Sequence, residues 1–178
     1  YLHGIQINQK RRSCLNVLGR EQLAAAIAAV WASLDTPTAA AYRQKLGMAD
    51  VPAMAVIVMP MVPAQASGIA FTCDPLNGRF DRLVVHAQWG LGESLVAGQA
   101  AGDEYVFVEN AASEWHLLEC RAGSKKTMSV ALADGGTASQ AVAPERAAGF
   151  VFETGVAEQL ANLATLAVML VFGSLLVV

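Results

Sequence analysis

Residues that could carry chemistry gather in a glycine-rich stretch, Trp89-Gly-Leu-Gly-Glu93, which Gly98 follows closely. Glycines at this spacing let the chain turn tightly or let the backbone approach another group closely. Glu93 is the ionisable residue of the stretch, and a functional role for it competes with a structural one. We favour the structural interpretation, in which these residues shape a tight passage from a strand into a helix.

The other candidate side chains stand alone. Asp74 precedes Pro75, a pairing typical of a turn rather than of a metal ligand. His86 lies in a strand pattern and is expected to be packed, and neither His3 nor His116 has a partner at a metal-ligand or catalytic spacing. The sequence therefore predicts no catalytic residue and no metal site within these residues.

Composition limits the class of protein. A hydrophobic content of 54% excludes general disorder, and a net charge of -3 leaves no electrostatic footprint for nucleic acid. The basic run at residues 10–12 is interpreted as solvated. Cys14, Cys73 and Cys120 are far apart and form no metal-ligand pair, so we expect three reduced thiols in a cytoplasmic protein.

The two ends of the chain are unusual. It begins with Tyr1 rather than Met, so we expect a fragment, a processed product or part of a longer protein. Residues 160–178 carry no charge and approach the length of a membrane-spanning helix. Asn162, Thr165 and Gly173 interrupt the run, so a core helix followed by a buried strand is favoured over membrane insertion.

Helices are expected first along the chain. Glu21–Leu34 is alanine-rich with apolar residues at helical spacing, and Thr38–Leu46 predicts a second helix that ends at Gly47. Trp31 and Tyr42 are expected to pack these helices on a sheet.

Strands are expected to follow. Leu15–Val17 predicts a short strand, and the near-continuous apolar run Ala53–Val62 is typical of a strand buried on both faces. Further strands are predicted at residues 69–72, 82–87, 105–109 and 115–119, the last two forming a hairpin. Residues 121–143 read as a polar surface excursion, and the last helix is predicted at about 156–171. The pattern is that of an α+β fold with helices first, then a mainly antiparallel sheet and a C-terminal helix.

Four segments, taken in order, resemble a known family. They are Leu15-Asn-Val17 with the helix ending Val30-Trp-Ala-Ser-Leu34; Met54-Ala-Val-Ile-Val-Met-Pro-Met-Val62; Ser67-Gly-Ile-Ala-Phe-Thr-Cys-Asp-Pro75; and Trp89-Gly-Leu-Gly-Glu93 with Asp103-Glu-Tyr105. Together they resemble the ATP-binding domain of phosphoenolpyruvate synthase, pyruvate phosphate dikinase and rifampicin phosphotransferase. The resemblance covers about residues 4–110 and extends more loosely to 173. It implies an ATP-grasp fold, in which two α+β lobes clamp the nucleotide.

On this resemblance, residues 1–178 are a single, partial ATP-grasp domain. Residues 1–17 correspond to a phosphate-loop remnant, and residues 18–50 to the helical part. Residues 51–120 correspond to the sheet with the adenine hinge, and residues 121–178 to the surface excursion and the C-terminal helix.

The hinge is expected at Met59-Pro-Met-Val62. Adenine needs an apolar slot, one backbone acceptor and one backbone donor, which the edge of a strand entering a turn can supply. Similarity to the family assigns these roles to the Met59 carbonyl and the Val62 amide, with Met61 beside them. The family usually has glutamine where this chain has Met59. The competing interpretation is that Met59 and Met61 are ordinary core methionines.

The phosphate side is expected near the start of the chain. The match places Gly4 at the phosphates and Ser13 as a hydroxyl donor. This chain carries about five more residues between Gly4 and Leu15 than the family pattern has, including the basic run at residues 10–12.

The resemblance also implies what lies outside these residues. In the family, a lysine and an arginine that activate ATP would precede Tyr1, and the acidic magnesium ligands would follow Gly173, where this chain reads Ser-Leu-Leu-Val-Val. The parent would use ATP and Mg²⁺ and pass phosphate through a histidine in a separate domain to pyruvate or a similar acceptor. The expected partners are that domain and the rest of the ATP-grasp domain. The isolated chain is predicted to have no ATPase or kinase activity and at best weak ATP affinity.

Two other classes of function stay open. One is a non-catalytic remnant of the same fold that binds a nucleotide weakly or binds a protein. The other is a domain tethered to a membrane by its apolar tail. The phosphate acceptor is also open, although the Gly-Leu-Gly-Glu form favours the synthase and rifampicin-type branches.

Overall fold

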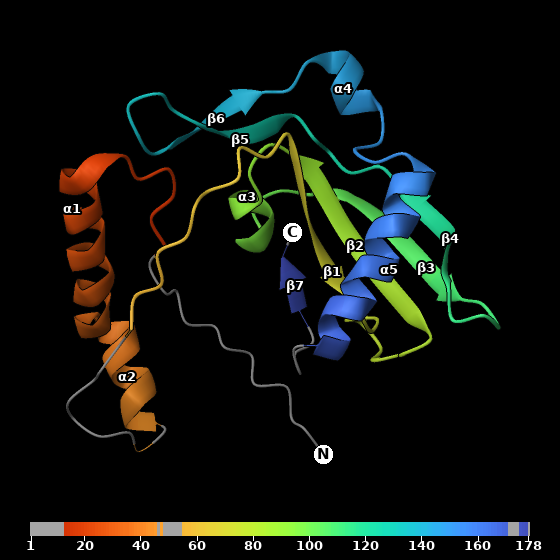
Figure 1. Cartoon of the computed structure of the whole chain (residues 1–178), viewed down its shortest axis with the longest axis horizontal. Coiled ribbons are helices and arrows are strands. Elements are labelled where there is room, and N and C mark those ends of the chain that lie inside the picture. The colour runs from red at the N-terminus through yellow and green to blue at the C-terminus, as the bar shows by residue number, and fades with distance from the viewer. Residues whose placement is uncertain (1–12, 46, 48–54, 171–174, 178) are drawn as a thin grey trace. The chain divides into compact units, whose positions relative to one another are not determined.

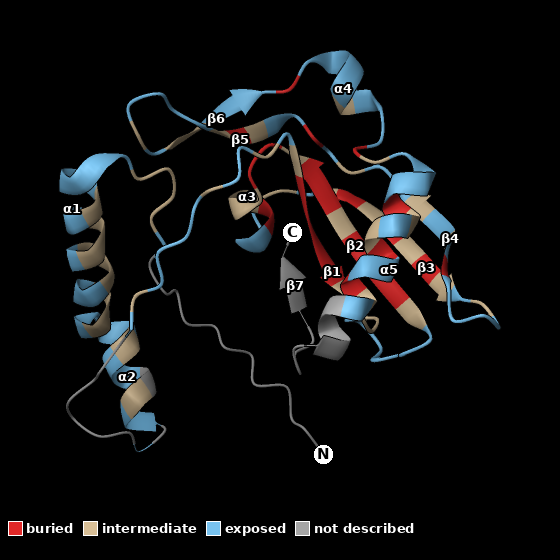
Figure 2. Cartoon of the chain, in the orientation of Figure 1, coloured by how far each residue is buried: buried red, intermediate tan, exposed pale blue. Residues whose placement is uncertain are grey.

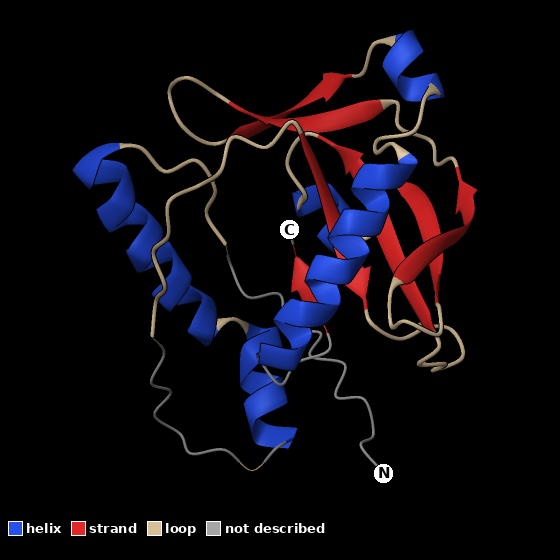
Figure 3. Ribbon diagram, turned by 45° about the vertical axis from the view of Figure 1, so that its right-hand side comes forward, coloured by secondary structure: helices blue, strands red, loops and turns tan. Residues whose placement is uncertain are grey.

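A computed structural model of the chain describes residues 13–45, 47, 55–170 and 175–177. The chain forms two compact units. The first comprises residues 1–62 and 131–137, and the second comprises residues 63–130 and 138–178. Helices come first, followed by a mainly antiparallel sheet and a long helix (Figure 3). The predicted α+β class and the order of its elements are confirmed.

The first unit contains two helices, as predicted. Helix α1 spans Gly19–Ala32 and passes through a short 3-10 helix, Ser33–Asp35, into α2 at Pro37–Lys45. Proline suits the first turn of α2 because it has no amide to leave unpaired there. Gly47 follows α2 with φ +63°, a left-handed conformation that favours glycine after a helix.

Neither strand predicted in the first unit forms among its described residues. Residues 15–17 are irregular, and Asn16 adopts φ +51°. Residues 55–62 are irregular as well, and Ile57 and Met59 are 83% and 75% exposed instead of buried. A β-strand forms only where its backbone can hydrogen-bond to a neighbouring strand. None of the described residues pairs in this way with residues 55–62.

The packing of Trp31 and Tyr42 on a sheet stays a prediction. Trp31 is 53% exposed, and no residue of α1 is buried. The side chain of Tyr42 lies outside the described part of the structure. Figure 2 shows α1 and α2 without the buried residues that mark the sheet.

The second unit is built on a five-stranded sheet of order β4-β3-β2-β1-β7. Its strands are β1 (Ala66–Phe71), β2 (Arg82–Trp89), β3 (Asp103–Glu109), β4 (Trp115–Arg121) and β7 (Leu175–Val177). All four neighbouring pairs are antiparallel. The predicted β3–β4 hairpin is confirmed, and β7 fulfils the expectation of a strand after the last helix.

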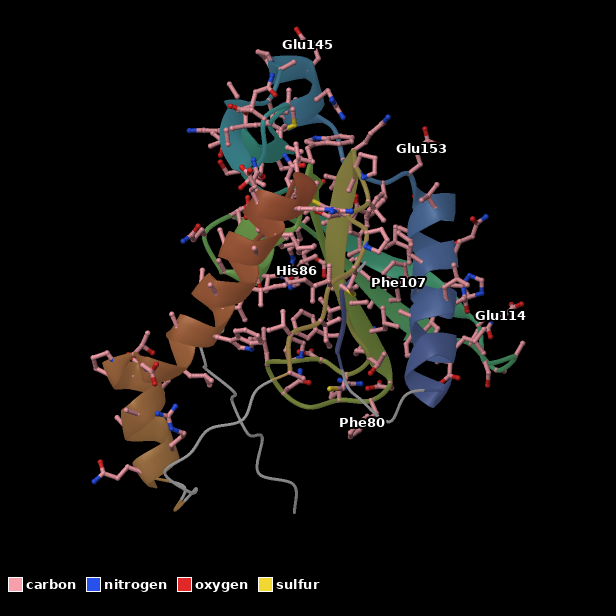
Figure 4. All side chains as sticks on the ribbon, turned by 60° about the vertical axis from the view of Figure 1, so that its left-hand side comes forward. Phe80, His86, Phe107, Glu114, Glu145 and Glu153 are labelled. Atoms are coloured by element: carbon pink, nitrogen blue, oxygen red, sulfur yellow. The ribbon has the colours of Figure 1, made fainter. Side chains whose placement is uncertain are left out.

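Helix α5, Thr154–Leu170, covers one face of this sheet (Figure 1). Ala157, Ala161 and Ala164 recur at helical spacing and are buried. Their small side chains let the helix lie close to Phe107, which points between the sheet and α5 (Figure 4). Burial of this face against one helix makes the core of the second unit.

The remaining elements are short. They are α3 (Glu93–Val96), β5 (Thr127–Ala131), β6 (Thr137–Ala141) and α4 (Pro144–Ala148). Strands β5 and β6 form a separate two-stranded sheet. The predicted surface excursion is only partly right, because Lys125, Ser129 and Val142 within it are buried.

Among the described residues, no single helix combines the length and apolar character needed to cross a membrane. The pair Gly19–Asp35 and Pro37–Lys45, bent by 49°, passes that test of length and composition only when taken together.

Candidate functional site

The predicted hinge, Met59 to Val62, lies in an irregular segment between α2 and β1. Met59 is 75% exposed and Val62 is 74% exposed, while Met61 is half-buried. The interpretation of these residues as ordinary core methionines therefore fails for Met59. The division into two units falls directly after Val62.

The backbone of residues 55–62 makes no hydrogen bond to the other residues that the structure describes. An unpaired row of backbone donors and acceptors beside apolar side chains is what a flat, heteroaromatic base requires. The Met59 carbonyl and the Val62 amide are both within this row.

The phosphate-side residues are less complete. Gly4 lies outside the described residues. Ser13 is exposed and precedes the turn at Asn16. No hydrogen bond of the described residues joins Ser13 to the hinge at Met59–Val62. The structure thus describes four of the five predicted binding residues, and Ser13 is not hydrogen-bonded to the other three.

The glycine-rich stretch is a structural turn. Gly90 has φ +76°, and a Cβ placed there would lie 2.3 Å from the Ser129 carbonyl oxygen. The Leu91 amide donates to that same oxygen over 2.9 Å. Glu93 accepts a hydrogen bond from the Ser129 hydroxyl, which agrees with the structural role expected for this carboxylate.

Asp74 forms a turn, as predicted. Its carboxylate accepts from the Leu76 amide and from the Asn77 side-chain amide, each over 2.8 Å. Both bonds order the loop between β1 and β2. Among the described residues, no group of three or more His, Cys, Asp or Glu side chains could hold a metal ion.

His86 lies on β2, on the strand positions that alternate with those facing α5 (Figure 4). Its ring meets Phe71 edge-on at 5.9 Å between centroids, and its Nε2 is 3.8 Å from a carboxylate oxygen of Glu104. These neighbours agree with the packed role expected for His86.

The strongest polar centre of the second unit was missed from the sequence. Asp103 is completely buried and accepts hydrogen bonds from the Gly123 amide at 2.9 Å and the Val151 amide at 2.7 Å. Buried Lys125 completes the centre with an ion pair to the same carboxylate. Asp103 entered the sequence analysis only as part of the Asp103-Glu-Tyr105 segment. The signal for its burial was alternation, since Asp103 is two residues before the buried Tyr105.

Tyr105 forms a second polar contact beneath α5. Its hydroxyl accepts from the Phe152 amide at 2.8 Å and donates to the Phe152 carbonyl at 3.1 Å. Burial raises the pKa of Tyr105 to about 12, because the charged phenolate would lose its hydration. This residue and Asp103 therefore fix the segment that leads into α5.

Comparison with known proteins identifies the family. A family model described as pyruvate phosphate dikinase, AMP/ATP-binding domain, matches residues 9–169. The phosphoenolpyruvate synthase of Aeropyrum pernix is 37% identical over 117 residues, which are 65% of this chain and 14% of that protein. The rifampicin phosphotransferase of Bacillus cereus is 34% identical over 151 residues, 84% of this chain and 16% of that protein. A probable phosphoenolpyruvate synthase of Archaeoglobus fulgidus is 33% identical over 159 residues, 88% of this chain and 20% of that protein.

This chain thus spans a fifth or less of the length of these relatives. The family match includes Ser13 and the whole hinge and begins after Gly4. Since it extends over most of the chain, the chain belongs to the family of pyruvate phosphate dikinase AMP/ATP-binding domains.

Proposed function

We propose that this chain is the ATP-binding portion of a phosphotransferase similar to phosphoenolpyruvate synthase, in which the backbone of Met59–Val62 binds adenine. The observation that carries the proposal is that residues 55–62 are mostly exposed and that their backbone makes no hydrogen bond to the other described residues. The family description, an AMP/ATP-binding domain, supports the choice of nucleotide.

The proposed recognition of adenine uses two backbone atoms. The Met59 carbonyl accepts from the exocyclic amino group, and the Val62 amide donates to a ring nitrogen. Pro60 has no amide, but its position need not donate. Met61 and Val62 supply apolar surface for the ring. Guanine carries an oxygen at the position of the amino group, so this arrangement discriminates against GTP.

The parent protein would pass phosphate from ATP through a histidine in another domain to pyruvate or a similar acceptor. Gly4 and Ser13 would lie at the phosphate side in an ATP-grasp arrangement. Magnesium would accompany the nucleotide, with ligands supplied by other parts of the parent. The names of the relatives, synthases and a rifampicin phosphotransferase, support a phosphotransferase and differ in the acceptor.

The test is an NMR titration of the chain with ATP, AMP and GTP up to millimolar concentration. ATP and AMP should shift the backbone resonances of residues 55–62, and GTP should not. Val62→Pro removes the proposed donor and should weaken ATP binding about tenfold, as expected for one lost hydrogen bond.

Ile57→Pro is the matched control, because it removes an amide of the same segment that also has no partner among the described residues, at a position with no role in the proposed contacts. It should leave the affinity for ATP within about threefold of the original value. Absence of any shift with ATP and AMP, or equal effects of the two variants, would contradict the proposed hinge and favour a remnant that binds a protein instead.

A further inference from the structure

Strand β4 lies at one edge of the five-stranded sheet, with β3 on its inner side. No described strand pairs with its outer side. An outer strand normally leaves every second amide and carbonyl without a partner, which makes it a template for a strand of another molecule. The outer side of β4 is therefore one place in the second unit where a further strand could add.

The amides of Trp115 and Leu117 point to this outer side. The Asn110 amide donates to the Glu114 carbonyl at 2.9 Å, so these two residues form a hydrogen-bonded pair next to the β3–β4 ladder. Hydrogen-bonded and non-hydrogen-bonded pairs alternate along an antiparallel ladder. By that alternation, the pairs that include Trp115 and Leu117 are of the second kind, and their amides point away from β3.

Two side chains of α5 bind these outward amides. The Trp115 amide donates to Asn162 Oδ1 at 3.1 Å, and the Leu117 amide donates to Glu158 Oε1 at 3.0 Å. Glu158 and Asn162 are four residues apart, so they lie one turn apart on the same side of the helix. The Asn162 side-chain amide also donates to the Glu158 carbonyl at 2.8 Å, which leaves its oxygen turned toward Trp115.

The rest of the β4 edge is interrupted in another way. Leu118 lies at a shift in register, opposite no residue of β3, and is 54% exposed. A bulge of this kind disrupts the ladder and bends the strand. Beyond it, Arg121 and Glu119 are exposed and form an ion pair at 2.8 Å. Bulges and charges commonly protect sheet edges. The part at Trp115–Leu117 has no bulge, so its protection falls to the two side chains of α5.

We propose that Glu158 and Asn162 close the outer side of β4 against a second copy of this chain. When both side chains are removed, two copies pair β4 to β4, antiparallel, across a twofold axis. Leu117 lies at that axis, because its amide and carbonyl point to the same side and can exchange two hydrogen bonds with Leu117 of the other copy. Both copies then offer the same unpaired groups, so the contact is complementary to itself. The inference rests on contacts within the second unit and does not require that the chain bind a nucleotide.

Sedimentation velocity over a range of concentrations tests the proposed pairing. The double variant Glu158→Ala, Asn162→Ala should shift from the mass of one chain, 18.7 kDa, toward twice that mass as the concentration rises. The matched control is Glu153→Ala, Gln159→Ala. It removes the same two kinds of group from exposed side chains that make no hydrogen bond to β4 in the described part of the chain. The control should sediment as the original chain does.

Amide hydrogen exchange at Leu117 identifies the surface that associates. In the dilute double variant, loss of the carboxylate should speed exchange of the Leu117 amide about tenfold, as expected for one lost hydrogen bond. At high concentration the exchange should slow again, because a carbonyl of the other copy takes the place of the carboxylate. Adding Leu118→Lys to the double variant should restore the mass of one chain, since a lysine on an edge strand opposes strand addition.

Glu158→Gln separates the hydrogen bond to β4 from the charge of this residue. Glutamine keeps a side-chain oxygen for the Leu117 amide but removes the carboxylate that lies 3.7 Å from His116 Nδ1. With Asn162 intact, Glu158→Gln should change exchange at Leu117 by less than about threefold, because an exposed ion pair contributes little. Glu158→Ala alone should speed it, and this comparison stands even if the double variant does not fold.

Three results would each overturn the proposal. The first is association of the double variant no stronger than that of the Glu153→Ala, Gln159→Ala control. The second is association without slower exchange at Leu117. The third is equal exchange at Leu117 in the Glu158→Gln and Glu158→Ala variants.

Discussion

Asp103 shows how one buried carboxylate can organise three segments. It accepts hydrogen bonds from the Gly123 and Val151 amides and pairs with Lys125, which has almost no exposed surface. Replacing it with alanine leaves a buried ammonium group without its anion, one of the few changes that severely destabilises a fold.

We expect Asp103→Ala to lower the free energy of unfolding by about 3–5 kcal/mol. Urea unfolding followed by circular dichroism measures the loss. The double variant Asp103→Ala, Lys125→Met should recover part of it, because no charge is then left unpaired. A loss below about 1 kcal/mol in the single variant would contradict the role given to this ion pair.

The Tyr105 hydroxyl predicts a pH dependence. Its pKa is raised to about 12 from an ordinary 10, so the folded chain holds this proton more tightly than the unfolded chain does. The stabilisation is therefore fully present below pH 10 and is lost as the pH rises through 12.

Tyr105→Phe removes both the titrating group and the acceptor of the Phe152 amide. At neutral pH it should lower the free energy of unfolding by about 1–3 kcal/mol. The difference in urea stability between the original chain and the variant should then narrow between pH 10 and 12. A difference that stays constant over that range would argue against selective destabilisation by the Tyr105 phenolate.

At the scale of elements, the turn from β2 to α3 depends on a glycine for two reasons. Gly90 has a left-handed φ, and its Cα faces the Ser129 carbonyl too closely for any side chain. Gly98 has a similar φ, +67°, but open space around it. Comparing substitutions at Gly90 and Gly98 therefore separates the cost of backbone strain from the cost of a steric clash.

Gly98→Ala should lower the free energy of unfolding by about 1 kcal/mol, the cost of a left-handed alanine. Gly90→Ala should cost about 2 kcal/mol more, because β5 must move away from the turn. Thermal unfolding of both variants tests the comparison. Equal losses would mean that the Gly90–Ser129 approach is easily relieved.

At the scale of the whole molecule, stability is concentrated in the second unit. Every residue of the hydrophobic core cluster lies between Ala70 and Ala164, and none belongs to α1 or α2. Figure 2 shows this as buried positions along β1, β2, β3 and the inner side of α5. A helix without a buried face has only its intrinsic propensity to stabilise it.

A chain that starts at Pro63 should therefore keep the cooperative unfolding transition of the intact chain. Its midpoint in urea should change little, while the helical signal of α1 and α2 is lost. Far-ultraviolet circular dichroism and urea unfolding check this. Loss of the cooperative transition on removing residues 1–62 would mean that the first unit contributes to the core after all.

Local pattern was sufficient where each segment could satisfy its own backbone or pair with a neighbour in sequence. Alanine-rich spacing predicted α1, alternation across a polar turn predicted the β3–β4 hairpin, and Asp74 before proline predicted its loop. The apolar residues at 55–62 also predicted a strand. No described strand pairs with them, so that prediction was wrong. The buried role of Lys125 left no trace in a stretch of small polar residues.

The sequence by itself determined the α+β order and the family, because these follow from local periodicity and residue identity. Only the tertiary structure decided that the backbone of residues 55–62 makes no hydrogen bond to the other described residues, that Asp103 and Lys125 form a buried pair, and that the loop between β5 and β6 binds Asn16 and Gln22. The last two depend on groups that meet across 20 or more residues. Contacts between residues so far apart in the sequence depend on how the elements pack together, and the sequence of a single segment does not determine them.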